Sequence, residues 1–265
     1  MKTCTSISGG QSSAYVAANY PSDFLVFALV CIEDANCTPK DKGLVKEVSD
    51  RIGREFIATA EDDIILHTVL DLEQYLGQSI DWVVGRPFDR LRNTSLPNIT
   101  WRHCTELMKI KPMFEWWKNH CLLGENEPIA MQIGFRSGEE NRAKNMLDRC
   151  DENGLRAYQK KPWQKPVFPM ITDGIRRDQV VNYWKDKPVR FAPQNNCVGC
   201  FHRNPLVLRK MFDLHPNKMK WFVEMEKRKK ARWKSEMSYE DIGKHRPQTE
   251  INFEDWSCDS GYCGL

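Results

Sequence analysis

Two adjacent glycines flanked by serines lie where a first strand would pass into a first helix. Residues 6–13 read Ser-Ile-Ser-Gly-Gly-Gln-Ser-Ser, and good helix formers follow from Ala14. Adjacent glycines allow a sharp turn with converging N–H groups, and a helix N-terminus adds unpaired donors that suit a phosphate. A plain strand–turn–helix connection fits the same pattern, and the Gly-Lys-Ser/Thr ending of a Walker loop is absent. The residues expected to bind phosphate are Ser8, Gly9, Gly10, Gln11, Ser12 and Ser13.

A closely spaced cysteine pair is the second chemical signal. Cys197 and Cys200 are separated by Val-Gly, and Gly199 permits a turn that points both sulfurs the same way. One pair does not complete a metal site. Cys104, at the start of a predicted helix whose dipole favours a thiolate, is the first candidate for a third ligand. An iron–sulfur cluster, a zinc site and ordinary turn cysteines all remain open, whereas a thioredoxin-type pair fits less well so late in the chain.

Charged side chains follow two of the predicted strands. Arg136 and Arg142 come after a buried strand, where α/β folds bind ligands, and their forked guanidinium groups suit phosphate or sulfate. The alternative is that both are solvated and paired with Glu139 or Glu140. Asp34 follows the second strand and is positioned to contact a ribose or base, although helix capping or exposure to solvent fits equally.

These motifs resemble those of a known superfamily. Ser8-Gly9-Gly10 and Ser13 match the pyrophosphate-binding loop (PP-loop), Ser-Gly-Gly-Xaa-Asp-Ser, of the adenine nucleotide alpha hydrolases, but Ser12 replaces the Asp of the ATP-hydrolysing members. Residues 102–112 are similar to a cysteine-containing segment of the phosphoadenosine phosphosulfate (PAPS) reductase family. Adenosine phosphosulfate (APS) reductases carry two cysteines there and this chain carries one. The chain most resembles sulfonucleotide reductases and their phage-encoded relatives.

The resemblance implies a set of ligands and partners. It implies an adenine nucleotide (PAPS, APS or ATP) and a [4Fe–4S] cluster held by Cys104, Cys197 and Cys200, with zinc as the alternative. It also implies a thioredoxin-type reductant. Cys263-Gly264-Leu265 is similar to the Glu-Cys-Gly-Leu-His tail whose cysteine attacks the sulfate sulfur, so Cys263 is the expected nucleophile. A role for Cys263 as cluster ligand or as bystander stays open.

Three functions are consistent with these features. The first is an enzyme of sulfonucleotide reduction or related sulfur transfer. The second is ATP-dependent thiolation of a nucleic-acid base, and the third is a non-catalytic nucleotide- or nucleic-acid-binding accessory protein. The basic run Lys227–Lys234 is a candidate nucleic-acid contact in which Trp233 would stack on a base, although such a run is more often a solvated helix face.

The elements that would position these residues alternate between strands and helices. Strands are expected at 2–7, 24–31, 56–60 and 128–135, with a strand or buried turn at 80–84. Helices are expected at 38–52, 62–76, 104–121, 176–184, 204–213 and 217–234. Residues 136–165 are polar and basic and read as a long active-site loop. The alternation predicts an α/β fold with a doubly wound, mostly parallel, Rossmann-like sheet over residues 1–195 and a helical C-terminal extension over 196–265.

Composition limits the compartment and the partners. The 265 residues carry a formal charge of only +3, so the protein as a whole does not create a strong field for nucleic acid. The longest apolar run, Phe24–Ile32, is too short to cross a bilayer, and no signal peptide is recognisable. We therefore expect a cytoplasmic protein, or one in the host cytoplasm if phage-encoded, without membrane partners. In that reducing compartment ten cysteines favour metal or redox roles.

Overall fold

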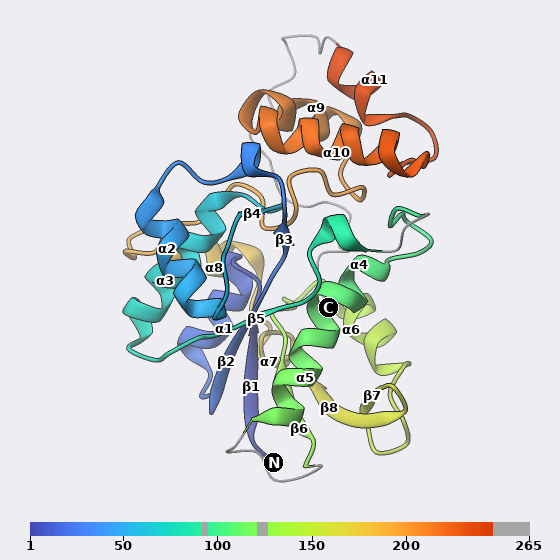
Figure 1. The fold of residues 1–265 in the computed structure, drawn as a ribbon. Helices are drawn as coiled ribbons and strands as arrows, with labels where there is room; N and C mark the ends of the chain where they lie inside the picture. The colour runs from blue at the N-terminus through green and yellow to red at the C-terminus, as the bar shows by residue number, and fades with distance from the viewer. Residues whose placement is uncertain (92–94, 121–126, 246–265) are drawn as a thin grey trace.

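A six-stranded sheet forms the centre of the protein in the computed structural model, which describes residues 1–91, 95–120 and 127–245 (Figure 1). The strands are ordered β5-β2-β1-β6-β8-β7, and every neighbouring pair is parallel except β7–β8. Their bounds are β1 (Thr3–Ile7), β2 (Phe24–Leu29), β5 (Asp81–Val84), β6 (Ile129–Gln132), β7 (Arg156–Tyr158) and β8 (Lys161–Val167). This confirms the predicted α/β class with a mostly parallel sheet, an arrangement compatible with a Rossmann-like fold.

Helices cover both faces of this sheet (Figure 1). One face packs against α1 (Gln11–Asn19), α2 (Lys42–Ile52), α3 (Asp63–Leu76) and α8 (Arg177–Trp184). The other packs against α5 (Lys111–Asn119) and α6 (Glu140–Leu147). Strand β2 shows why: Leu25 and Phe27 enter the first core, while Val26 enters the second. A strand buried on both faces reads as a continuous apolar run, and that is how 24–31 reads.

The C-terminal helices pack on a second, small sheet. Strands β3 (Cys31–Ile32) and β4 (Ala58–Thr59) pair antiparallel beyond the end of β2. Their residues share a core with α9 (Pro205–Leu214), α10 (Pro216–Lys229) and α11 (Tyr239–Lys244), which lie together at the top of Figure 1. The extension is thus attached to the same end of the molecule where β1 and β2 finish. The remaining short elements are η1 (Ala35–Cys37), η2 (Phe88–Arg90), α4 (His103–Thr105), η3 (Glu106–Ile110) and α7 (Pro169–Thr172).

The expectation of a long loop over 136–165 is wrong. This region forms α6 and the β7–β8 hairpin, and β8 joins the main sheet beside β6. The sequence signal is weak because β8 contains two prolines and two lysines. The strand nevertheless buries Trp163, which is 1% exposed and packs against Phe114 and Trp117 of α5. One large aromatic side chain supplies the apolar area that several smaller residues would otherwise provide.

Two helix boundaries also differ from expectation. Helix α2 begins at Lys42 rather than Thr38, because the Asp41 carboxylate caps it, accepting hydrogen bonds from the N–H groups of Gly43 and Leu44 at 2.8 and 3.1 Å. Helix α10 ends at Lys229, where the next residue adopts a left-handed conformation, rather than continuing to 234. Within the described ranges, no helix combines the length and the apolar character that crossing a membrane requires.

Candidate nucleotide and cluster site

A small cavity lies where the end of β1, the α4–α5 segment and the cysteine pair meet. Its volume is about 90 Å³, several times the space that one water molecule needs. It is lined by residues 6–8, by Ala28 and Val30, by several side chains between 102 and 113, and by residues 196, 197 and 200–202. Ser8, Cys104, Cys197 and Cys200 are all among the lining residues. The fold therefore brings the first residue of the glycine loop and all three predicted ligand cysteines to one cavity.

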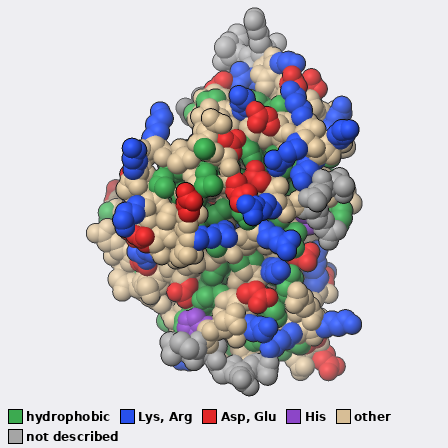
Figure 2. Space-filling model, in the orientation of Figure 1, with side chains coloured by type: hydrophobic (Ala, Val, Ile, Leu, Met, Phe, Trp, Pro, Cys, Tyr) green, Lys and Arg blue, Asp and Glu red, His purple; other side chains and the backbone are tan. Residues whose placement is uncertain are grey.

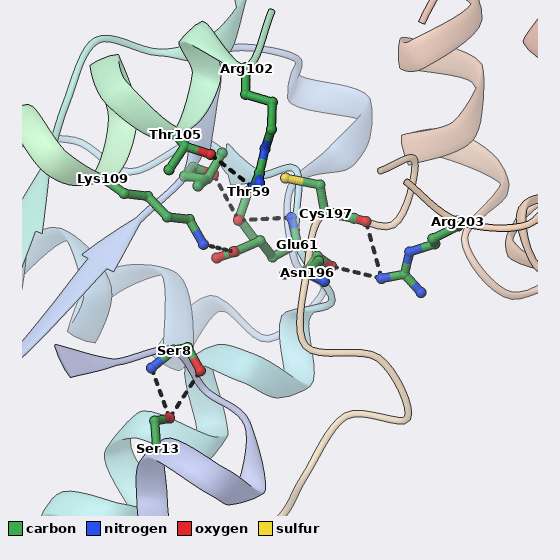
Figure 3. A network of polar contacts seen from close by, with 11 residues as sticks. Ser8, Ser13, Thr59, Glu61, Arg102, Thr105, Lys109, Asn196, Cys197 and Arg203 are labelled. Atoms are coloured by element: carbon green, nitrogen blue, oxygen red, sulfur yellow. Dashed lines mark hydrogen bonds and ion pairs between the residues drawn. The ribbon is translucent and has the colours of Figure 1, made fainter. Parts of the chain in front are cut away.

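The glycine loop is held closed by its own serines. The hydroxyl of Ser13 accepts a hydrogen bond from the Ser8 N–H at 3.0 Å and donates to the Gly10 carbonyl at 3.0 Å, and it lies 2.9 Å from the Ser8 hydroxyl (Figure 3). Gly9 has a φ of +73°, and a Cβ there would lie 2.4 Å from Ile65. The loop therefore leads directly into α1, whose first N–H groups have no partner within the helix.

The segment that carries Cys104 is an irregular helix. The short α4 passes into the π-helical turn η3 and then into α5, so the predicted helix over 104–121 is present as far as Asn119. Turns of this kind occur often at functional sites. Burial raises the pKa of the Cys104 thiol to about 11, with Cys200 adding to the effect. Burial therefore disfavours the thiolate form that the helix start was expected to favour.

Cys197 and Cys200 lie on a turn that is joined to the edge of β4. Cys197 forms an isolated bridge with Glu61, and the Val198 N–H donates to the Ala60 carbonyl at 2.9 Å. Burial, followed by the neighbouring charge of Glu61, raises the pKa of the Cys197 thiol well above its ordinary value. Cys104 and Cys200 raise it further, so the three sulfurs are close enough to interact electrostatically.

Sequence reasoning missed an ion pair at this cavity. Lys109 Nζ lies 3.2 Å from Glu61 Oε1, and the two side chains point toward each other beside Cys197 (Figure 3). Glu61 is 1% exposed, and its Oε2 has no hydrogen-bond partner among the described residues. Burial lowers the pKa of Lys109, but the charges of Glu61 and Cys197 outweigh this and raise it. The one sequence feature that could have pointed to this ion pair is the position of Lys109, five residues after Cys104.

The cavity offers three soft ligands, although the described residues contain no group of three or more His, Cys, Asp or Glu placed to hold a metal ion. Cys104, Cys197 and Cys200 all line it, and thiols are ligands that both iron–sulfur clusters and zinc take. The chemistry of these donors therefore fits an iron–sulfur cluster, and zinc stays the alternative.

The two predicted anion-binding arginines lie outside this cavity and share one carboxylate. The backbone N–H and the Nε of Arg136 donate to Glu139 Oε2 at 2.9 and 3.1 Å. Arg142 Nη1 donates to Glu139 Oε1, and its guanidinium carbon lies 4.2 Å from the centre of the Phe135 ring. This is the paired alternative considered above. Arg102, in contrast, does line the cavity.

Two other predicted site residues do not reach the cavity. Asp34 caps η1, accepting a hydrogen bond from the Asn36 N–H at 2.9 Å, which is the capping alternative. It is not among the residues that line the cavity. Cys263, the expected nucleophile, lies outside the described residues, so its role stays a prediction.

The basic run Lys227–Lys234 is largely engaged within the protein. Lys227 pairs with Glu240 at 2.8 Å, and Lys234 Nζ donates to the Phe201 carbonyl at 2.9 Å. Trp233 is 1% exposed, so the expected base stacking by this residue is wrong. On the face shown in Figure 2, acidic side chains are interspersed with the basic ones. Nucleic-acid contact by the remaining residues of the run stays a prediction.

We compared the chain with known protein families, curated proteins and solved structures, and none of them matched.

Proposed function

We propose that this protein is an enzyme of the PAPS reductase type that binds an adenine nucleotide beside a [4Fe–4S] cluster. The observation that carries the proposal is the shared cavity. Ser8 of the glycine loop and the three cysteines come from segments almost 200 residues apart in the chain, yet they line one space of about 90 Å³. A strand–turn–helix connection with unrelated buried cysteines would not require that convergence.

In this proposal the nucleotide phosphates bind the N–H groups at the start of α1, and Cys104, Cys197 and Cys200 hold the cluster. When bound, the cluster supplies electrostatic stabilisation at the reacting sulfur. Arg102 lies at the cavity and is the cation best placed for a sulfate or phosphate end. Arg136 and Arg142, whose guanidinium groups Glu139 already occupies, would reach the ligand only by exchanging partners.

Burial raises the pKa of the Cys104 thiol to about 11 and that of the Cys197 thiol well above its ordinary value, so neither is a ready nucleophile. The nucleophile is therefore a different cysteine, for which Cys263 is the candidate. Its thiolate would attack the sulfate sulfur, and the bond from sulfur to the phosphate oxygen would break, so that the nucleotide leaves with that electron pair. A thioredoxin-type dithiol would then release sulfite and become a disulfide.

The first test is anaerobic reconstitution with iron and sulfide, followed by metal analysis and absorbance. Wild type should bind about four irons per chain, and C104S and C197S should lose most of them. C150S is the matched control, because Cys150 follows α6 and does not line the cavity. A colourless protein without iron would overturn the cluster proposal.

The second test separates the reactions. Sulfite release from PAPS or APS with a dithiol reductant, lost in C263S, supports reduction. Sulfur transfer to tRNA or DNA with ATP supports thiolation. Three cysteines line the cavity, and a cluster held by three cysteines would leave one iron open to carry the sulfur. Tight nucleotide binding without either activity would instead support the accessory protein.

A further inference from the structure

One buried arginine lies behind the cysteine turn. Arg203 is 5% exposed, and its Nη2 donates to the carbonyl oxygens of Asn196 and Cys197, each at 3.2 Å. Figure 3 shows it on the opposite side of the Cys197 segment from Lys109 and Glu61. It therefore contacts the backbone that orients the sulfur without entering the cavity.

The charge of Arg203 has no direct partner within the described part of the chain. No ion pair there includes Arg203, and its Nε and Nη1 are buried without a hydrogen-bond partner among the described residues. The carboxylate of Asp62 acts on it only from a distance and is paired with His215 at 3.2 Å. An uncompensated buried charge is costly, by several kcal/mol in general. Burial accordingly lowers the pKa of Arg203.

A negatively charged group at the cysteines would remove this cost. Cysteine ligands bind metals as thiolates, so a loaded site places negative charge at the turn that Arg203 contacts. Groups that lie behind metal ligands commonly orient them and adjust the redox potential of the metal.

We propose that Arg203 is a positioning residue that fixes the Cys197–Cys200 turn and supplies the buried positive charge that balances an anionic cluster. This inference rests on the proposed function. It predicts two effects that a purely structural arginine would not produce. A positive charge near a redox group favours the form with the additional electron, so removal of that charge makes the midpoint potential more negative. The stabilisation that the cluster gives to the fold also decreases.

The test compares R203M and R203K with R156M in reconstituted, full-length protein. Arg156, on β7, is a matched control because it too has a buried Nη1 without a partner among the described residues and a pKa lowered by burial, whereas only Arg203 of the two donates to the carbonyls of the cysteine turn. The measurements are the midpoint potential by redox titration, the rate of iron loss to a chelator, and the melting temperature with and without the cluster.

R203M should shift the midpoint potential to more negative values and lose iron about tenfold faster, in the range typical when a group behind a metal ligand is removed. The difference in melting temperature between loaded and metal-free protein should shrink. R203K keeps the positive charge but lacks the planar guanidinium group that donates to two carbonyls at once. Its midpoint potential should therefore stay near that of wild type, while it loses iron faster than wild type does. R156M should match wild type in all three measurements. If R203M does not fold, R203Q should give the same shift in potential.

An unchanged potential in R203M and R203Q, or an equal shift in R156M, would overturn the role of Arg203 while leaving the proposed function intact. Failure of the wild type to bind iron would overturn both, and the two failures are therefore distinguishable.

Discussion

The two sides of the cavity are built in different ways. The side proposed to bind phosphate, here called the phosphate side, is local: the glycine loop and the start of α1 are consecutive in the chain, and Ser8, Gly10 and Ser13 close the loop among themselves. The cysteine side depends on distant contacts, because the Cys197–Cys200 turn is held by Ala60 of the main domain and by Tyr239 of the extension. Perturbing the extension should therefore impair the cysteine side first, and perturbing the loop should impair the phosphate side first.

The largest expected effect is that of Trp233→Ala. Trp233 packs against Phe88, Phe222 and Tyr239 and donates from Nε1 to the Phe222 carbonyl at 2.9 Å. Truncation of a buried Trp costs about 3–5 kcal/mol, measurable by chemical denaturation. Below the melting transition, iron binding should fall far more than nucleotide binding, as metal analysis and calorimetry would show. Equal losses of both would contradict the separation of the two sides.

Gly9→Ala should produce the opposite pattern. The left-handed φ of +73° and the contact of the new Cβ with Ile65 should together cost about 1–3 kcal/mol. Nucleotide affinity should fall while iron content stays near four per chain. Gly77→Ala is the control, because Gly77 has a φ of +63° but nothing lies within 4 Å of the position that a Cβ would take there. Were Gly77→Ala to weaken nucleotide binding equally, the effect would be general strain.

Tyr239→Phe tests a single contact on the cysteine side. The Tyr239 hydroxyl donates to the Gly199 carbonyl at 2.9 Å, inside the turn between the two cysteines. Loss of one buried hydrogen bond should cost about 1 kcal/mol. The chelator should remove iron faster from this variant, with nucleotide affinity unchanged. Unaltered iron loss would show that the turn is held without Tyr239.

The smallest effect concerns the acid stability of helix α3. Arg190 Nη2 lies 2.7 Å from Oδ1 of Asp71, a residue of α3. The hydrogen bonds that Arg190 donates are the largest cause of the lowered pKa of Asp71. The pKa of Asp71 is lower in the folded protein than in the unfolded chain, where it is near 3.9. The pair therefore contributes its full share to the free energy of unfolding above pH 3.9, and this contribution is lost as the pH falls through the pKa of folded Asp71. Arg190 is well exposed, so the pair should contribute less than about 1 kcal/mol. Asp71→Asn should flatten the acid limb of the unfolding curve in denaturant titrations; an unchanged limb would mean that the pair contributes nothing.

Local patterns allowed prediction of the site residues that belong to one continuous segment. The glycine loop, Cys104 and the Cys197–Cys200 pair are recognisable because a turn or helix start fixes their neighbours. Glu61 and Arg203 were missed because their roles arise only from folding. Glu61 meets Lys109 across 48 positions of the chain, and the position of Arg203 matters because the extension buries it.

The same limit explains the errors in the fold. Strand β8 forms because β6 and β7 offer it partners on both sides, which a sequence with prolines at 162 and 166 does not indicate. The paired alternative for Arg136 and Arg142 was visible in the sequence, and the position of the Glu139 carboxylate between the two guanidinium groups selects it.

The π-helical turn η3 changes the directions in which Cys104 and Lys109 point around the helix axis. In a regular α-helix, residues three and four apart share a face, so Cys104 and Lys109, five apart, would diverge around the axis. Hydrogen bonding from i to i+5 brings residues five apart nearly into line, and both side chains reach the same cavity. Deletion of one residue within the turn would therefore rotate the downstream helix relative to Cys104 and separate the cation from the thiol.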